Sequence, residues 1–119
     1  MKQNLNFRNI TCRLNKAIGI NLTHHVVERM LLRKFSECAL IAIWEFGVKR
    51  ELDSGKSLRV LNQGDVPFLR TILAKLNPRN AFESSLRIGV LEILKKFSNS
   101  KNYECTLVVR YNNLVVTVF

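Results

Sequence analysis

The sequence predicts an α+β fold in which helices cover one face of an antiparallel sheet. Segments with the apolar spacing of a helix occur along the chain beside shorter segments that alternate with the period of a strand. Of the 119 residues, 47% are apolar, and only 5 are Gly and 2 are Pro. Such a chain can bury enough apolar surface to fold as a single domain over residues 1–119. We expect about three helices and a sheet built from two hairpins, with an N-terminal strand as a weaker candidate.

The first part of the chain predicts one strand and one helix. Residues 5–14 alternate loosely between apolar and polar side chains, which favours a short strand. Asn21 or Thr23 can cap a helix over about 24–36, because either side chain can accept a bond from an unpaired backbone N–H. The apolar residues of this helix follow the i, i+3, i+4 spacing of a buried face: Val27, Met30, Leu31 and Phe35.

The next segment allows two interpretations. Residues 38–48 are nearly all apolar, and periodicity cannot separate a buried helix from a buried strand in so short a run. Its β-branched and aromatic side chains favour a strand, and residues 53–56 have the chemistry of a turn. We therefore expect a hairpin at about 39–62, with a continuous helix that extends to Leu52 as the alternative.

Two further helices are predicted after this hairpin. Asp65 or Val66 caps the first of them, and Pro67 occupies its first turn, where the missing N–H costs nothing. Residues 77–78, Asn and Pro, end it. The second runs over about 79–97. Its predicted buried face consists of Phe82, Leu86, Val90, Ile93, Leu94 and Phe97.

The C-terminus predicts an antiparallel hairpin. Apolar and polar residues alternate over 103–111, and the run at 114–119 is apolar apart from one Thr. Asn112 and Asn113 supply the turn between them, because Asn tolerates the positive φ that tight hairpin turns require. We expect the last strand to be paired inside the sheet, since an exposed apolar edge invites pairing with another chain.

Charge is the most informative feature for function. Nineteen Lys and Arg against nine Asp and Glu give a formal net charge of +10. Because surplus positive charge attracts polyanions at long range, we expect a non-enzymatic protein that binds a nucleic-acid backbone, with RNA slightly favoured over DNA. Phosphate contacts leave no sequence signature, so the expected contacts are the local concentrations of positive charge. They are Arg8, Arg13, Lys16, Arg33, Lys34, Lys49, Arg50, Lys56 and Arg59.

An assembly or interaction module is the alternative function. The apolar strand at 114–119 would then pair with a second copy to form a homodimer, or the positive surface would meet an acidic protein. The two helices joined at 77–78 would also suit a helix-turn-helix, which requires a short turn of defined geometry.

No sequence motif supports catalysis, cofactor binding or a metal site. Residues 55–57 match the end of a phosphate-binding loop, but Arg50 stands where that loop needs a glycine. His24 and His25 are adjacent and point about 100° apart on a helix, so they cannot hold one metal together. We expect no catalytic residue, no cofactor, no metal site and no small-molecule substrate.

Several features indicate an intracellular protein. The longest apolar run, 38–44, is short of the roughly 20 residues of a membrane span, and residues 1–8 lack the apolar segment of a secretory signal. The three cysteines, Cys12, Cys38 and Cys105, are far apart and odd in number, which fits a reducing compartment. We expect cytoplasm or nucleus, with no secretion and no membrane partner.

Overall fold

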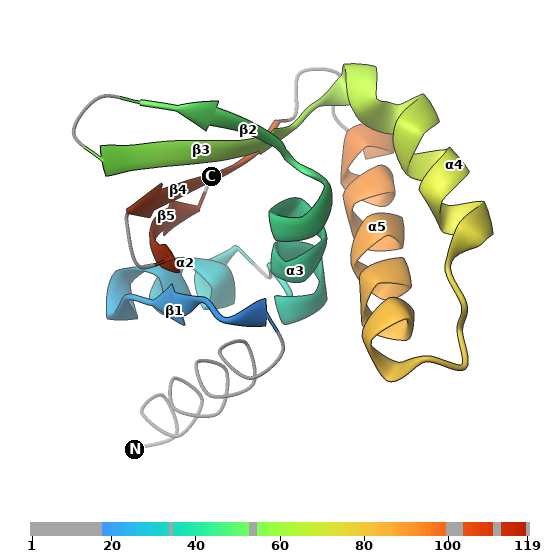
Figure 1. Ribbon diagram of the computed structural model, residues 1–119, viewed down its shortest axis with the longest axis horizontal. Helices are drawn as coiled ribbons and strands as arrows, with labels where there is room; N and C mark the ends of the chain where they lie inside the picture. The colour runs from blue at the N-terminus through green and yellow to red at the C-terminus, as the bar shows by residue number, and fades with distance from the viewer. Residues whose placement is uncertain (1–17, 34, 53–54, 100–103, 111–112, 119) are drawn as a thin grey trace.

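The α+β class is confirmed. The computed structural model describes residues 18–33, 35–52, 55–99, 104–110 and 113–118. Within these ranges, four α-helices pack against a mixed sheet of five strands (Figure 1). The strand expected at 5–14 lies outside the described residues.

The sheet has the strand order β1-β5-β4-β3-β2. The strands are β1 (Asn21–Leu22), β2 (Val48–Glu51), β3 (Lys56–Leu61), β4 (Cys105–Arg110) and β5 (Leu114–Val118). Neighbouring strands run antiparallel except β1 and β5, which are parallel. The expected antiparallel sheet is therefore mixed, because a strand of two residues ahead of the first described helix pairs with the outer side of β5.

The helix α2 (His24–Leu32) begins after Thr23, which confirms Thr23 as the cap. The Oγ1 of Thr23 accepts a hydrogen bond from the N–H of Val26 at 3.2 Å. It is shorter than the expected 24–36. The reason is Ser36, whose Oγ accepts the N–H of Ala39 at 3.0 Å and so begins the next helix. Phe35 is nevertheless buried, in the connection between the two helices.

The helix α3 (Glu37–Phe46) corrects the prediction of a hairpin over 39–62. The first part of the segment 39–62 is helical, and only β2 and β3 form a hairpin. The alternative of one continuous helix to Leu52 is also wrong, because the helix ends at Phe46. Five consecutive residues, 39–43, are buried, so this helix has little polar surface for periodicity to detect. It ends at Gly47, where a Cβ would lie 2.5 Å from the carbonyl oxygen of Ile43.

The β2–β3 and β4–β5 hairpins use backbone conformations that suit their turn residues. Gly55 has φ +73°, and the N–H of Leu52 donates to the carbonyl of Lys56 at 2.8 Å to close the first loop. Asn113 has φ +57°, as expected for Asn in the second turn. Strand β5 lies between β4 and β1, so the prediction that the last strand is paired inside the sheet is confirmed.

The helices α4 (Val66–Lys75) and α5 (Ala81–Asn99) match the last two predicted helices, and a short 3-10 turn, η2 (Gln63–Asp65), precedes them. Figure 1 shows α4 and α5 side by side and running in opposite directions. This arrangement differs from the roughly perpendicular crossing of a helix-turn-helix. None of the described helices combines the length and apolar character that crossing a membrane requires.

The elements form successive layers. Helix α2 packs on β5, and α3 packs on β3 and β4, with the main core between these helices and the sheet. Helix α5 packs on α3, and α4 packs on α5 (Figure 1). The opposite face of the sheet carries no described helix, which makes it the first surface to consider for binding.

Candidate functional site

Strand register decides which side chains face the helices. Leu61 pairs with Cys105, and both are buried in the core. Because side chains alternate along a strand, Arg59 shares this helix-covered face, whereas Lys56 and Leu58 lie on the opposite one. We call that opposite face the open face. On β2, β3 and β4, the same alternation and register assign to it Val48, Arg50, Lys56, Leu58, Val60, Thr106, Val108 and Arg110.

Three cations come together on the open face. Lys56 lies directly opposite Arg110 across β3 and β4. Arg50 lies opposite Leu58, and Leu58 follows Lys56 by two residues on the same face of β3. Like charges that face each other across neighbouring strands destabilise a sheet. Within the described ranges, no side chain forms an ion pair or hydrogen bond with any of these three cations. The fold thus holds positive charges together with no described anion between them.

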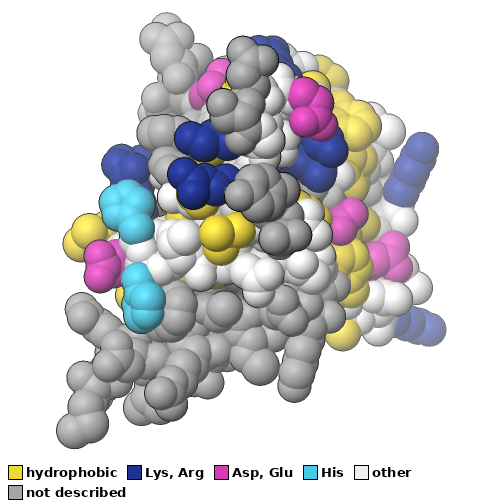
Figure 2. Space-filling view, turned by 60° about the vertical axis from the view of Figure 1, so that its left-hand side comes forward, with side chains coloured by type: hydrophobic (Ala, Val, Ile, Leu, Met, Phe, Trp, Pro, Cys, Tyr) yellow, Lys and Arg dark blue, Asp and Glu magenta, His cyan; other side chains and the backbone are white. Residues whose placement is uncertain are grey.

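The rest of the open face is aliphatic. Val48 is 52% exposed, while Leu58 and Val108 are half-buried beside the cations. At the far end of the strands, Val60 and Thr106 pair with each other and are buried. Figure 2 shows several Lys and Arg side chains close together on the side that carries the β2–β3 hairpin, with hydrophobic and acidic side chains beside them. The exposed part of the face therefore combines a cationic end with an apolar floor.

The other two hairpin cations face the helices and have partners. The guanidinium of Arg59 lies 4.4 Å from the ring centroid of Trp44, and its Nη1 donates to the carbonyl oxygen of Trp44 at 2.9 Å. A cation in this position satisfies a carbonyl at the C-terminal end of α3. Lys49 pairs with Glu51, Nζ to Oε1, at 3.1 Å. The structure thus gives Arg59 a structural role.

Substitution of Arg59 by Lys should lower the free energy of unfolding by about 1–2 kcal/mol, because Lys loses the planar stack on Trp44 and the fixed hydrogen-bond geometry. Urea unfolding followed by the fluorescence of Trp44, the single tryptophan of the chain, measures this. Lys49→Gln is the control, since an exposed ion pair contributes at most about 1 kcal/mol. An unchanged midpoint for Arg59→Lys would contradict the structural role.

The expected contact residues are separated by the fold. Arg50 and Lys56 lie on the open face, and Lys49 and Arg59 lie on the face that the helices cover. Arg33 caps the C-terminus of α2 and is exposed. The remaining four lie outside the described residues: Arg8, Arg13, Lys16 and Lys34.

Arg110 was missed by the sequence analysis. The alternation of β4 showed that Arg110 and Val108 share a face, but only the pairing of β3 with β4 places Arg110 opposite Lys56. The sequence carried no signal for that pairing, because the two strands are separated by α4 and α5.

The polar groups at the start of α3 do not form an activated nucleophile. Burial, and then the nearby Glu92 and Glu37, raise the pKa of the Cys38 thiol above its usual range. The thiol therefore stays protonated near neutral pH, whereas a nucleophilic cysteine needs a lowered pKa. The hydroxyl of Ser36 donates to the Glu92 carboxylate, which ties α3 to α5. Among the residues that the structure describes, no cluster of His, Cys, Asp and Glu could hold a metal ion.

The C-terminal strand has neighbours on both sides at its beginning. Leu114 and Val115 pair with β1 in parallel and with β4 on the other side. A homodimer through this strand, with residues 116–118 as the outer edge or with β1 displaced, stays a prediction.

Comparison with known proteins gives no relative from which a function could be carried over. No family model, no curated protein and no solved structure matches the chain. Its function must therefore be inferred from its own residues, and the cations of the open face are the first group to consider.

Proposed function

We propose that this protein is a non-enzymatic nucleic-acid-binding protein whose open face holds the sugar–phosphate backbone, with RNA slightly favoured over DNA. The observation that supports the proposal is the direct opposition of Lys56 and Arg110, with Arg50 beside them and no described acid paired to any of the three. A phosphate bound among these cations relieves their mutual repulsion. The bound state is therefore favoured by the same charges that strain the free sheet.

The composition of the face favours backbone contacts over base recognition. None of the eight residues that β2, β3 and β4 place on the open face is aromatic, so these residues offer no ring on which a base could stack. Leu58 and Val108 provide apolar contact for sugars and base edges, while the cations fix the phosphates. Binding by these residues should therefore be strongly dependent on salt and weakly dependent on sequence.

The test begins with purification with and without nuclease, followed by binding of labelled single-stranded RNA, single-stranded DNA and duplex DNA across a range of salt concentrations. With three phosphate contacts on a single strand, the logarithm of the association constant should fall with the logarithm of salt concentration with a slope of about −2. Further contacts from residues outside the described ranges would steepen it. Polyglutamate of similar length is the control for general polyanion binding by a protein of net charge +10.

Two results would contradict the proposal. One is an affinity for RNA and DNA that stays flat between low and moderate salt. The other is a preference for polyglutamate over both nucleic acids, which would identify an acidic protein as the better partner.

A further inference from the structure

A groove runs between α4 and α5, the two helices that pack outside α3. One hollow of about 410 Å³ is lined by Arg70, Leu73, Ala74, Leu76 and Arg87. A second, of about 180 Å³, is lined by Gln63, Val66, Arg70, Leu94, Phe97 and Ser98. Arg70 lines both hollows, so they adjoin at this residue, and we call the two together the α4–α5 groove.

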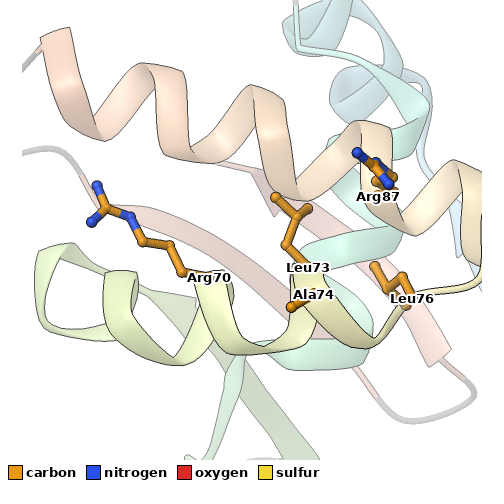
Figure 3. Close-up of a pocket in the computed structure, with 5 residues that line it drawn as sticks. All are labelled: Arg70, Leu73, Ala74, Leu76 and Arg87. Atoms are coloured by element: carbon orange, nitrogen blue, oxygen red, sulfur yellow. The ribbon is translucent and has the colours of Figure 1, made fainter.

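The groove carries positive charge on an apolar floor. Figure 3 shows Arg70 on α4 and Arg87 on α5 toward opposite ends of the larger hollow, with Leu73 between them and Leu76 at the end of Arg87. Neither arginine has an ion pair or hydrogen bond with another described side chain, and no Asp or Glu lines either hollow. Glu83, four residues before Arg87 on α5, accepts the N–H of Asn77 at 3.5 Å.

The apolar surface continues from the groove onto α5. Leu91 is 46% exposed and lies four residues after Arg87 and three before Leu94, so helical spacing puts all three on one side of α5. Ile88, 47% exposed, lies next to this side. A partner that covers the groove therefore buries Leu91 as well, and the gain comes from apolar contact at the floor and from charge at the rim.

We propose that the α4–α5 groove binds an amphipathic, acidic helix of a protein partner. Charge complementarity favours a negatively charged occupant. The groove has two arginines without described partners and no lining acid, and the chain has a net charge of +10. The apolar floor calls for anchors at i, i+3 or i+4 and i+7, as in helix-in-groove recognition. Helix α4, with 10 residues, is about 15 Å long, which matches roughly three turns of a bound helix.

Other occupants fit this groove less well. A nucleic-acid backbone is the weaker candidate here, because the lining offers it two cations toward opposite ends of the hollow, whereas the open face holds three cations together. A small molecule needs a cavity that encloses most of its surface, whereas the larger hollow is mostly open to solvent. The groove is thus a second surface, and it uses none of the cations assigned to nucleic acid.

The probe for this inference is a labelled helical peptide with Leu at the anchor positions and Glu on its flanks. Its control has the same composition, with the Leu residues spread around the helix. We expect the amphipathic peptide to bind and the control peptide to bind at least about tenfold more weakly, because only the first can place its anchors in one groove. Fluorescence anisotropy of the full-length protein measures both affinities.

Two variants locate the binding. Arg70→Glu combined with Arg87→Glu should weaken the binding of the amphipathic peptide by about tenfold or more, because both rim charges then repel the Glu flanks. Leu91→Ser, at an exposed position, should weaken it several-fold with the fold intact, as circular dichroism would verify. Arg50→Glu with Lys56→Glu, the matched change on the open face, should leave peptide binding within about twofold, since neither residue lines the groove.

The inference is overturned if the two peptides bind equally, or if the open-face variant weakens the peptide as much as the groove variant does. It is also overturned if the groove variant loses RNA binding while its peptide binding is unchanged, because the groove would then be a nucleic-acid surface. These outcomes are independent of the proposed function, which is tested by the open-face variant with RNA.

Discussion

Substitution of Gly89 by Ala should destabilise the protein, although alanine favours a helix by about 1 kcal/mol over glycine. Gly89 lies in α5 where that helix crosses the start of α3. A Cβ at this position would overlap the carbonyl oxygen of Cys38 and lie 2.5 Å from its carbonyl carbon. Both atoms belong to the backbone, so α3 and α5 must move apart for a methyl group to fit.

The expected magnitude follows from two opposing effects. Overpacking of a core costs about 1–3 kcal/mol and occasionally more. We expect the upper part of this range, about 2–3 kcal/mol, because the clashing atoms of Cys38 are backbone, and the helix propensity of alanine offsets about 1 kcal/mol of it. We expect Gly89→Ala to lower the free energy of unfolding by about 1–2 kcal/mol, and Gly89→Val by at least about 3 kcal/mol or to the point of unfolding. Urea denaturation with Trp44 fluorescence and far-ultraviolet circular dichroism measures both variants.

Ile88→Ala is the control for this series. It introduces alanine in the same turn of α5 at a position that is 47% exposed, so its effect should stay within about 0.5 kcal/mol. A Gly89→Ala variant as stable as the parent would show that α3 and α5 are not in close contact at Cys38.

The amphipathic helices could be predicted from the sequence, because one side of each is polar. In α5 the expected buried face was right at Leu86, Val90, Ile93 and Phe97. In α4 the apolar spacing covers Phe68, Leu69, Ile72, Leu73 and Leu76, but Phe68 is 52% exposed and only Leu69 is buried. Spacing therefore locates a helix more reliably than it assigns the last residue of the buried side, which depends on where the neighbouring helix lies.

Helix α3 could not be predicted from periodicity, because apolar residues cover almost all of it. Ile41, Ile43 and Trp44 favour a strand by intrinsic preference, and burial between the sheet and α5 overrides that preference. Local signals did exist: Ser36 with Glu37 marks a helix start, and Gly47 marks its end. Those two boundary signals would have predicted the helix where apolar spacing could not.

The candidate site was harder to predict than the fold. The sequence identified Arg50 and Lys56 only as members of a charged segment, and it grouped with them Lys49 and Arg59, which face the other side of the sheet. Strand alternation separates the two pairs, but only if the hairpin boundaries are known. Strand pairing brings in Arg110, and it depends on contacts between segments that are remote in sequence.

Replacement of Arg50, Lys56 and Arg110 by Gln should weaken the binding of single-stranded RNA by about 100-fold at about 0.1 M salt. Each phosphate contact on a single strand contributes about −0.7 to the slope of log affinity against log salt, so three contacts contribute about two powers of ten between 1 M and 0.1 M salt. The slope of the triple variant should accordingly be shallower by about 2. Anisotropy titrations at several salt concentrations measure both quantities.

The matched control is a triple variant on the helical side of the molecule, Arg70→Gln with Arg87→Gln and Lys95→Gln. It removes the same three positive charges from the net +10 of the chain, and all three residues are exposed on α4 or α5. If affinity depended only on net charge, both triple variants would lose affinity for RNA to the same extent. The proposal requires a loss at least about tenfold larger for the open-face variant, because only its cations contact phosphate directly.

Stability provides an independent criterion for the open face. If Lys56 and Arg110 are kept together for an anion, their replacement by Gln removes a repulsion between directly opposed strand positions. The free energy of unfolding without RNA should then stay constant or rise by up to about 1 kcal/mol while affinity falls. If these cations had a structural role instead, their replacement would lower the free energy of unfolding, because stabilising contacts would be lost. Any loss of RNA affinity would then follow from unfolding. An open-face variant that is both less stable and weaker in binding would therefore contradict the assignment of these cations to phosphate.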